Sequence, residues 1–137
     1  MGRWRPPEFA QHPMPFPSPF ESRGVCREVV DGDTYTVLLD RGFLEYGYER
    51  IRLRGADAPE IFHPRNDAER EFGFAVKHRV EALILDKPVR VVTHEFERTF
   101  ERWVGDVWWW DGTAWYDLAS TLVAEHLTKA DLPPAVA

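Results

Sequence analysis

Residues 51–60 read IRLRGADAPE, and residues 29–34 read VVDGDT. Each stretch begins with the β-branched and aliphatic residues of a strand and then changes to the small and acidic residues of a turn. Pro59 cannot donate a ladder hydrogen bond, so the strand that contains Ile51 must end before it. Both stretches therefore place carboxylates where a strand ends.

The flanking sequence predicts five strands and two helices. Runs rich in apolar and β-branched residues, bounded by Gly, Asp and Pro, predict strands over residues 25–30, 34–39, 43–55, 89–94 and 103–110. Helical spacing of apolar residues predicts helices over residues 67–85 and about 117–127. This order predicts a mainly β, α+β fold. It is a five-stranded OB-type Greek-key barrel, with one helix between strands three and four and another near the C-terminus.

The 137 residues are enough for one domain with a real core. Residues 1–22 hold six of the eleven prolines, which predicts a Pro-rich arm, then a domain over 23–128 and a tail over 129–137. No apolar run approaches the ~20 residues of a membrane span, and no secretory signal is visible, so we expect a cytoplasmic protein without a membrane partner. The single cysteine, Cys26, is expected to be a buried, inert thiol.

The charge balance is acidic, with 17 Lys and Arg against 23 Asp and Glu, a formal net charge of −6. Affinity for nucleic acids comes largely from Lys and Arg, so this balance argues against tight, non-specific coating of DNA. It does not argue against catalysis in one cleft, where basic groups gather or a divalent cation offsets the negative charge.

The carboxylates at the strand ends, together with one arginine, suit a metal-assisted attack on a phosphodiester. Asp33, Asp57 and Glu60 provide oxygen ligands for a hard cation and a group that handles a proton. Arg52 provides a guanidinium that matches a phosphate. If the two stretches lie side by side, these residues predict a nuclease.

Three motifs resemble the thermonuclease (staphylococcal-nuclease-like) family in order, spacing and strand context. They are DGDT at residues 31–34, RL leading into DAPE within residues 52–60, and FER at residues 100–102 before a strand. Each alone is a weak signal, but all three in order are a strong one. The resemblance covers residues from about 25 to 127. It implies a calcium-dependent phosphodiesterase that acts on DNA and RNA.

Position by position, the resemblance implies a calcium site. Asp33 and Asp57 would be the metal carboxylates, and the main-chain carbonyl of Ala58 would be the third protein ligand. That position is commonly Thr in the family, but a carbonyl ligand survives the change to Ala. Asp31 would be a further carboxylate near the metal, behind these ligands.

The resemblance also implies the catalytic residues. Glu60 would activate or orient the attacking water, and Arg52 and Arg102 would bind the phosphate and stabilise the charge of the transition state. Glu101 departs from the family, which usually has Gly there. Its carboxylate could hold Arg102 away from the phosphate or point to solvent.

The same residues are open to other interpretations. The DGD sequence is also common in plain turns, and Arg102 could pair structurally with Glu101 or Glu97. A barrel of this fold could bind nucleic acid or protein without catalysis. It could also be a structural module that docks through its tryptophan-rich strand.

Three consecutive tryptophans lie on the last predicted strand. Trp109 must point to the opposite side from Trp108 and Trp110, so one face is exposed or covered. Stacked bases, the N-terminal arm or a partner chain could cover it. Because lysines are few, we expect few phosphate contacts and a preference for single-stranded DNA or RNA.

Overall fold

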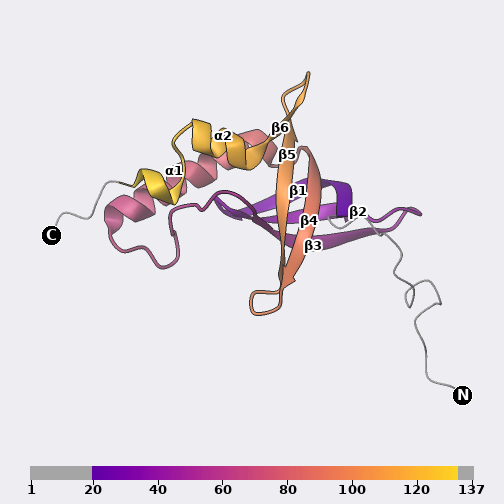
Figure 1. Cartoon of the computed structure of the whole chain (residues 1–137), viewed down its shortest axis with the longest axis horizontal. Helices are drawn as coiled ribbons and strands as arrows, with labels where there is room; N and C mark the ends of the chain where they lie inside the picture. The colour runs from indigo at the N-terminus through magenta and orange to yellow at the C-terminus, as the bar shows by residue number, and fades with distance from the viewer. Residues whose placement is uncertain (1–19, 133–137) are drawn as a thin grey trace, which may run out of the picture.

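The computed structural model describes residues 20–132 (Figure 1). Its strands are β1 (Phe20–Asp31), β2 (Thr34–Asp40), β3 (Tyr46–Leu53), β4 (Pro88–Glu97), β5 (Arg102–Trp110) and β6 (Trp115–Asp117). Its helices are α1 (Asp67–Ile84), α2 (Leu118–Ala124) and the short 3₁₀ turn η2 (Lys129–Asp131).

The strands form one sheet that closes on itself. Neighbours follow the order β3-β2-β1-β4-β5-β6 and pair antiparallel, and β3 also pairs with β5 in parallel. This last pairing closes β1 to β5 into a barrel, while β6 extends β5 beyond it. The prediction of a mainly β, five-stranded barrel with α1 between its third and fourth strands is confirmed (Figure 1).

The core follows from alternation along the strands. Tyr35 and Val37 of β2 and Ile51 and Leu53 of β3 are buried, and the residues between them lie on the outer face. Each apolar side chain buried in this way contributes about 1.5–3 kcal/mol. Helix α1 packs on the barrel through Val76, Val80, Leu83 and Ile84. Figure 1 shows α1 and α2 together on one side of the barrel.

Helix α1 begins and ends close to the predicted positions. The side chain of Asn66 caps its N-terminus, accepting a hydrogen bond from the Glu69 N–H at 2.9 Å. At the other end Leu85 is extended, and β4 begins at Pro88. The helix therefore stops one residue before the predicted end.

Two differences from the predicted strands concern the N-terminal half. β1 begins at Phe20, which pairs with Thr93 of β4, so the last three residues of the range predicted as an arm belong to the barrel. The rest of that arm lies outside the described residues. β3 begins at Tyr46, later than predicted, because Phe43 and Leu44 adopt positive φ angles of 53° and 61° in the turn before it.

A third difference is the extra strand β6. Asp111 accepts hydrogen bonds from the N–H groups of Thr113 and Ala114, which closes a turn after β5. This turn brings Trp115 opposite Trp110. Helix α2 can therefore begin only after β6, at Leu118 rather than at 117 as predicted.

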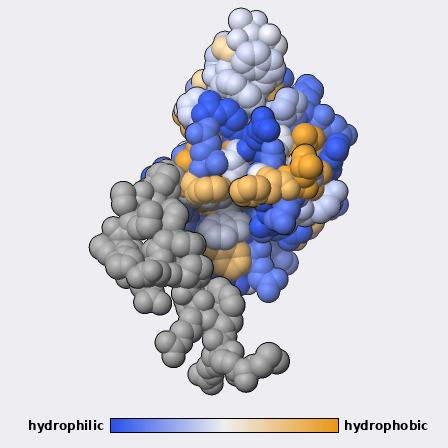
Figure 2. Space-filling view, turned by 90° about the vertical axis from the view of Figure 1, so that its right-hand side faces the viewer, coloured by the Kyte–Doolittle hydropathy of each residue, from blue (hydrophilic) through white to orange (hydrophobic). Residues whose placement is uncertain are grey.

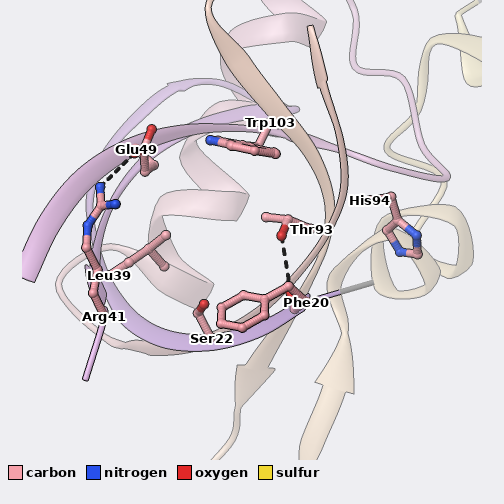
Figure 3. A pocket seen from close by; sticks show the side chains of 8 residues that line it. All are labelled: Phe20, Ser22, Leu39, Arg41, Glu49, Thr93, His94 and Trp103. Carbon is pink, nitrogen blue, oxygen red and sulfur yellow. Dashed lines mark hydrogen bonds and ion pairs between the residues drawn. The ribbon is translucent and has the colours of Figure 1, made fainter. Parts of the chain in front are cut away.

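An open cavity of about 420 Å³ lies between Leu39, Trp103 and Phe20 of the barrel. Figure 3 shows this cavity, with α1 behind the ring of strands. On the surface, hydrophilic residues interrupt short apolar bands, as Figure 2 shows for one face. Cys26 is fully buried, and burial raises the pKa of its thiol to about 12. None of the helices within residues 20–132 has the length and apolar character needed to span a membrane.

Candidate active site

The turn between β1 and β2 holds Asp33 by contacts from three segments. Its own N–H donates to Asp31 Oδ1 at 3.0 Å, and its carbonyl accepts from the N–H of Leu53 at 2.7 Å. Its carboxylate accepts from the N–H of Ala58 at 2.8 Å and from the Thr34 hydroxyl at 3.3 Å. The two stretches that carry the predicted site therefore do lie side by side.

Gly32 makes this close approach possible. A Cβ atom at Gly32 would lie 2.7 Å from Ala58 Cβ and 2.7 Å from Val76 Cγ1. No side chain fits there, because real Cβ atoms essentially never approach so closely. The glycine thus lets the turn pack against both Ala58 and helix α1.

Arg52, near the end of β3, lies between two carboxylates. Its Nη1 donates to the carbonyls of Leu53 at 2.7 Å and Ala56 at 3.1 Å, and lies 3.4 Å from Asp33 Oδ2. Its Nη2 donates to Asp57 Oδ1. Asp33 and Asp57 thus share one guanidinium, although they are far apart in the sequence.

Burial and charge shift the pKa values of this group in opposite directions. The pKa of Asp33 is raised to about 6, first by burial and then by its hydrogen bond and repulsion with Asp31. Burial alone would lower the pKa of Arg52, but the charges of Asp33 and Asp57 raise it overall. A buried carboxylate with a raised pKa is stabilised in its charged form by any nearby cation.

Arg102, the first residue of β5, joins this group through Thr34. Its Nη1 donates to the Thr34 hydroxyl at 3.3 Å, and its Nε donates to Glu97 Oε1 at 2.7 Å. Its guanidinium also lies 4.5 Å from the centre of the Phe100 ring. Of the two pairings considered from the sequence, the structure shows the one with Glu97. Glu101 is exposed and has a positive φ of 50°.

Glu60 is exposed in the loop between β3 and α1. This loop lies against α1, where a Cβ at Gly73 would come within 3.0 Å of the Pro59 carbonyl and of Ile61. Glu69 is almost fully buried beside it. The hydrogen bond from Arg65 lowers the pKa of Glu69, and a hydrogen bond from the Glu60 backbone adds to this effect. The main chain at Glu60 is therefore held while its carboxylate faces solvent.

Two of the predicted calcium ligands, Asp33 and Asp57, lie on either side of the Arg52 guanidinium. Within residues 20–132, no three His, Cys, Asp or Glu side chains gather in a way that could hold a metal ion. The predicted set of calcium ligands contains only two carboxylates, Asp33 and Asp57. Both contact the guanidinium of Arg52. Ala58 is buried beside them, and its N–H is bonded to Asp33. Two carboxylates and a carbonyl fit calcium, which takes oxygen ligands in irregular geometry.

Comparison with known families matches residues 50–131 to the staphylococcal nuclease homologue family. This match spans more than half of the 137 residues. The chain belongs to the staphylococcal nuclease homologue family. The matched segment contains Arg52, Asp57, Glu60 and Arg102, whereas Asp33 lies before it, so the position of Asp33 rests on its contacts in the barrel. Comparison with curated proteins gives no match.

Two polar residues of this nuclease-family site were not predicted from the sequence. Thr34 links Asp33 to Arg102, because its hydroxyl donates to the first and accepts from the second. Glu69 supports the loop that carries Glu60. Its position three residues after the cap Asn66 is a helix-start signal that could have identified it as structural.

Proposed function

We propose that this member of the family is a calcium-dependent nuclease that hydrolyses phosphodiester bonds of DNA, RNA or both. The observation that carries the proposal is the pair of contacts from Arg52 to Asp33 and Asp57, with Arg102 joined to the same group through Thr34. Carboxylates for a cation and two guanidinium groups for a phosphate thus meet on one surface of the barrel.

The two arginines would bind the phosphate and stabilise the charge that develops on it. Each guanidinium has five N–H donors, and Arg102 uses only Nε and Nη1 in its contacts with Glu97 and Thr34. Arg52 would exchange its contact with Asp57 for one with the phosphate. The Asp57 side chain is 72% exposed, so water can solvate it after the exchange.

The carboxylates would have separate roles. Glu60, which faces solvent, would activate or orient the attacking water. Asp33, Asp57 and the Ala58 carbonyl would hold calcium, with Asp31 behind them. Calcium bound there would supply positive charge that stabilises the phosphate oxygens in the transition state.

Digestion assays test the proposal. Plasmid DNA and a long RNA are incubated with the full chain in calcium, in magnesium and in chelator. We expect cleavage in calcium and its loss in chelator. The Glu60→Gln variant, purified in the same way, controls for contaminating nucleases. Cleavage that persists in chelator, or that is equal in wild type and Glu60→Gln, contradicts the proposal.

A second candidate function is binding without cleavage. The observation that favours it is that carboxylates already pair with both arginines, Asp57 with Arg52 and Glu97 with Arg102. Such a barrel would bind single-stranded oligonucleotides or a protein but leave nucleic acids intact. Binding of an oligonucleotide with no cleavage under any metal condition would support this second function.

A further inference from the structure

A row of side chains on the outer face of β3 leads away from the candidate active site. Because residues of a strand alternate, Tyr46, Tyr48, Arg50 and Arg52 share this outer face, while Ile51 lies in the core. Alternate residues on one face are about 6.7 Å apart, so the row extends about 20 Å from its first tyrosine to Arg52. One end of the row is therefore part of the candidate active site.

The two tyrosines of this row present their rings to solvent. Tyr46 is 60% exposed and Tyr48 is 63% exposed. Neither belongs to any of the aromatic ring pairs found within residues 20–132. Leu38 pairs with Tyr48 in the sheet, and Val25 pairs with Leu38, so half-buried apolar residues continue the surface over three strands. Flat rings on such a surface are suited to stacking on bases.

Arg50 lies between the tyrosines and the active site. It is exposed and takes part in no ion pair with the rest of the described chain. Its neighbour on β2 is Thr36. Of the carboxylates on β1 and β2, Asp40 pairs with Arg23, and Glu28 lies on β1, opposite Thr36 and one strand beyond it from Arg50. The row therefore offers a cation to a phosphate next to the cleaved one.

The equivalent row on β5 is less suited to a nucleic acid. Its outer face runs from Arg102 through Asp106 to Trp108. Asp106 contacts Arg54 and His94, so this stretch of β5 offers a phosphate backbone no arginine of its own between Arg102 and the tryptophans. Trp109 points inward and donates to the Thr121 hydroxyl at 3.0 Å. These contacts favour the row on β3 over the tryptophan strand as a stacking surface.

We propose that Tyr46, Tyr48 and Arg50, which we call the β3 row, bind the nucleotides that flank the cleaved bond in a single-stranded nucleic acid. The tyrosines stack on unpaired bases, and Arg50 contacts the phosphate between those bases and Arg52. This inference rests on the proposed nuclease function of the adjacent site. A duplex does not fit the β3 row, because its bases stack on one another and leave no free faces.

Fluorescence anisotropy tests this inference with the full chain carrying Glu60→Gln, in calcium. The probes are a labelled dinucleotide and a labelled single strand of about twelve nucleotides, within the range of OB-fold site sizes. We expect the longer strand to bind more tightly than the dinucleotide. Tyr46→Ala and Tyr48→Ala should each weaken its binding by about 5- to 100-fold, while dinucleotide binding stays unchanged.

Matched variants separate stacking from folding and charge. Tyr48→Phe keeps the ring and should bind like the parent. Tyr116→Ala removes an exposed tyrosine on β6 and should leave binding unchanged. Arg50→Gln should reduce the slope of log affinity against log salt by about 0.7, the value for one phosphate of a single strand.

Two further results distinguish the inference from the proposed function. Equal affinity of the longer strand for the parent and for the Tyr46→Ala, Tyr48→Ala double variant overturns the β3 row, as does tighter binding of a duplex. Dinucleotide hydrolysis by the chain without the Glu60→Gln change tests the active site separately. If neither the dinucleotide nor the longer strand is cleaved but the tyrosine variants still lose binding of the longer strand, the nuclease function fails and the β3 row stands.

Discussion

The two arginines of the site are held in different ways. Their side chains are almost equally shielded, at 19% exposed for Arg52 and 20% for Arg102. Arg52 donates to two main-chain carbonyls and is balanced by the buried Asp33. Arg102 begins a strand after an exposed turn and contacts only side chains, namely the half-buried Glu97, the exposed ring of Phe100 and the buried Thr34. Main-chain carbonyls and a buried carboxylate thus orient the half of the site at Arg52, and side-chain contacts alone orient the half at Arg102. We expect damage to the first half to affect folding as well as chemistry.

The largest expected effect on kcat comes from Glu60, which belongs to neither half of the site. Glu60 is exposed, so Glu60→Gln should leave the free energy of unfolding unchanged. It should lower kcat by about 1,000-fold, because a positioned general base contributes between 10²- and 10⁴-fold. Single-turnover digestion in calcium measures this, and Glu71→Gln, an exposed carboxylate on α1, is the matched control. Equal losses in both variants would remove Glu60 from the mechanism.

Replacing each arginine in turn tests the comparison directly. Arg52→Ala and Arg102→Ala should each lower kcat by about 100-fold or more, the loss typical of one electrostatic donor. Only Arg52→Ala should also reduce the free energy of unfolding, by about 1–3 kcal/mol, because Asp33 stays buried without its cation. Urea unfolding and digestion kinetics on the same preparations measure both effects.

Two outcomes would break the comparison between the arginines. Equal destabilisation by the two substitutions would show that the contacts of Arg102 are as important for folding as those of Arg52. Near-wild-type digestion by Arg102→Ala would show that its pairing with Glu97 keeps it away from the phosphate. In that case this chain would have lost the role that the family resemblance implies.

A smaller effect is expected on calcium affinity when Asp33, which lies in the same half of the site as Arg52, is replaced. Asp33→Ala removes one of two carboxylates from the proposed ligand set, so calcium binding should weaken at least about tenfold. Titration calorimetry measures this, with Glu71→Ala as the control for a general loss of negative charge. Because only two carboxylates contribute, we expect the wild-type affinity to be weak as well. Equal calcium affinity in wild type and Asp33→Ala would contradict the site.

Much of the fold could be predicted because its signals are local. A run of β-branched and apolar residues identified β2, and the spacing of apolar residues with the cap Asn66 identified α1 to within one residue. β6 was missed because its three residues are too few to show a period. The positive φ angles of Phe43 and Leu44 were also missed, since these residue types rarely adopt them.

The site could be predicted only as a set of residues, not as an arrangement. The sequence indicated Asp33 and Arg52, but their contact depends on the register that pairs Thr34 with Arg52. That register is set by the turn between β2 and β3, where Phe43 and Leu44 adopt the positive φ angles that the sequence did not indicate. The choice of Glu97 over Glu101 as partner of Arg102 depends in the same way on the shape of the β4–β5 turn.

The smallest expected effect lies in that turn. Glu101 has a φ of 50°, which costs a residue with a Cβ atom about 1 kcal/mol relative to Gly. Glu101→Gly should therefore increase the free energy of unfolding by up to about 1 kcal/mol, less the greater entropy of glycine in the unfolded chain. Glu101→Ala is the matched control, because it removes the carboxylate but keeps the Cβ atom. It should not stabilise the protein.

Both variants should retain wild-type kcat, since Arg102 pairs with Glu97. If both instead digest DNA faster than wild type, the Glu101 carboxylate restrains Arg102 in solution, and the weaker half of the site is held by two acids rather than one.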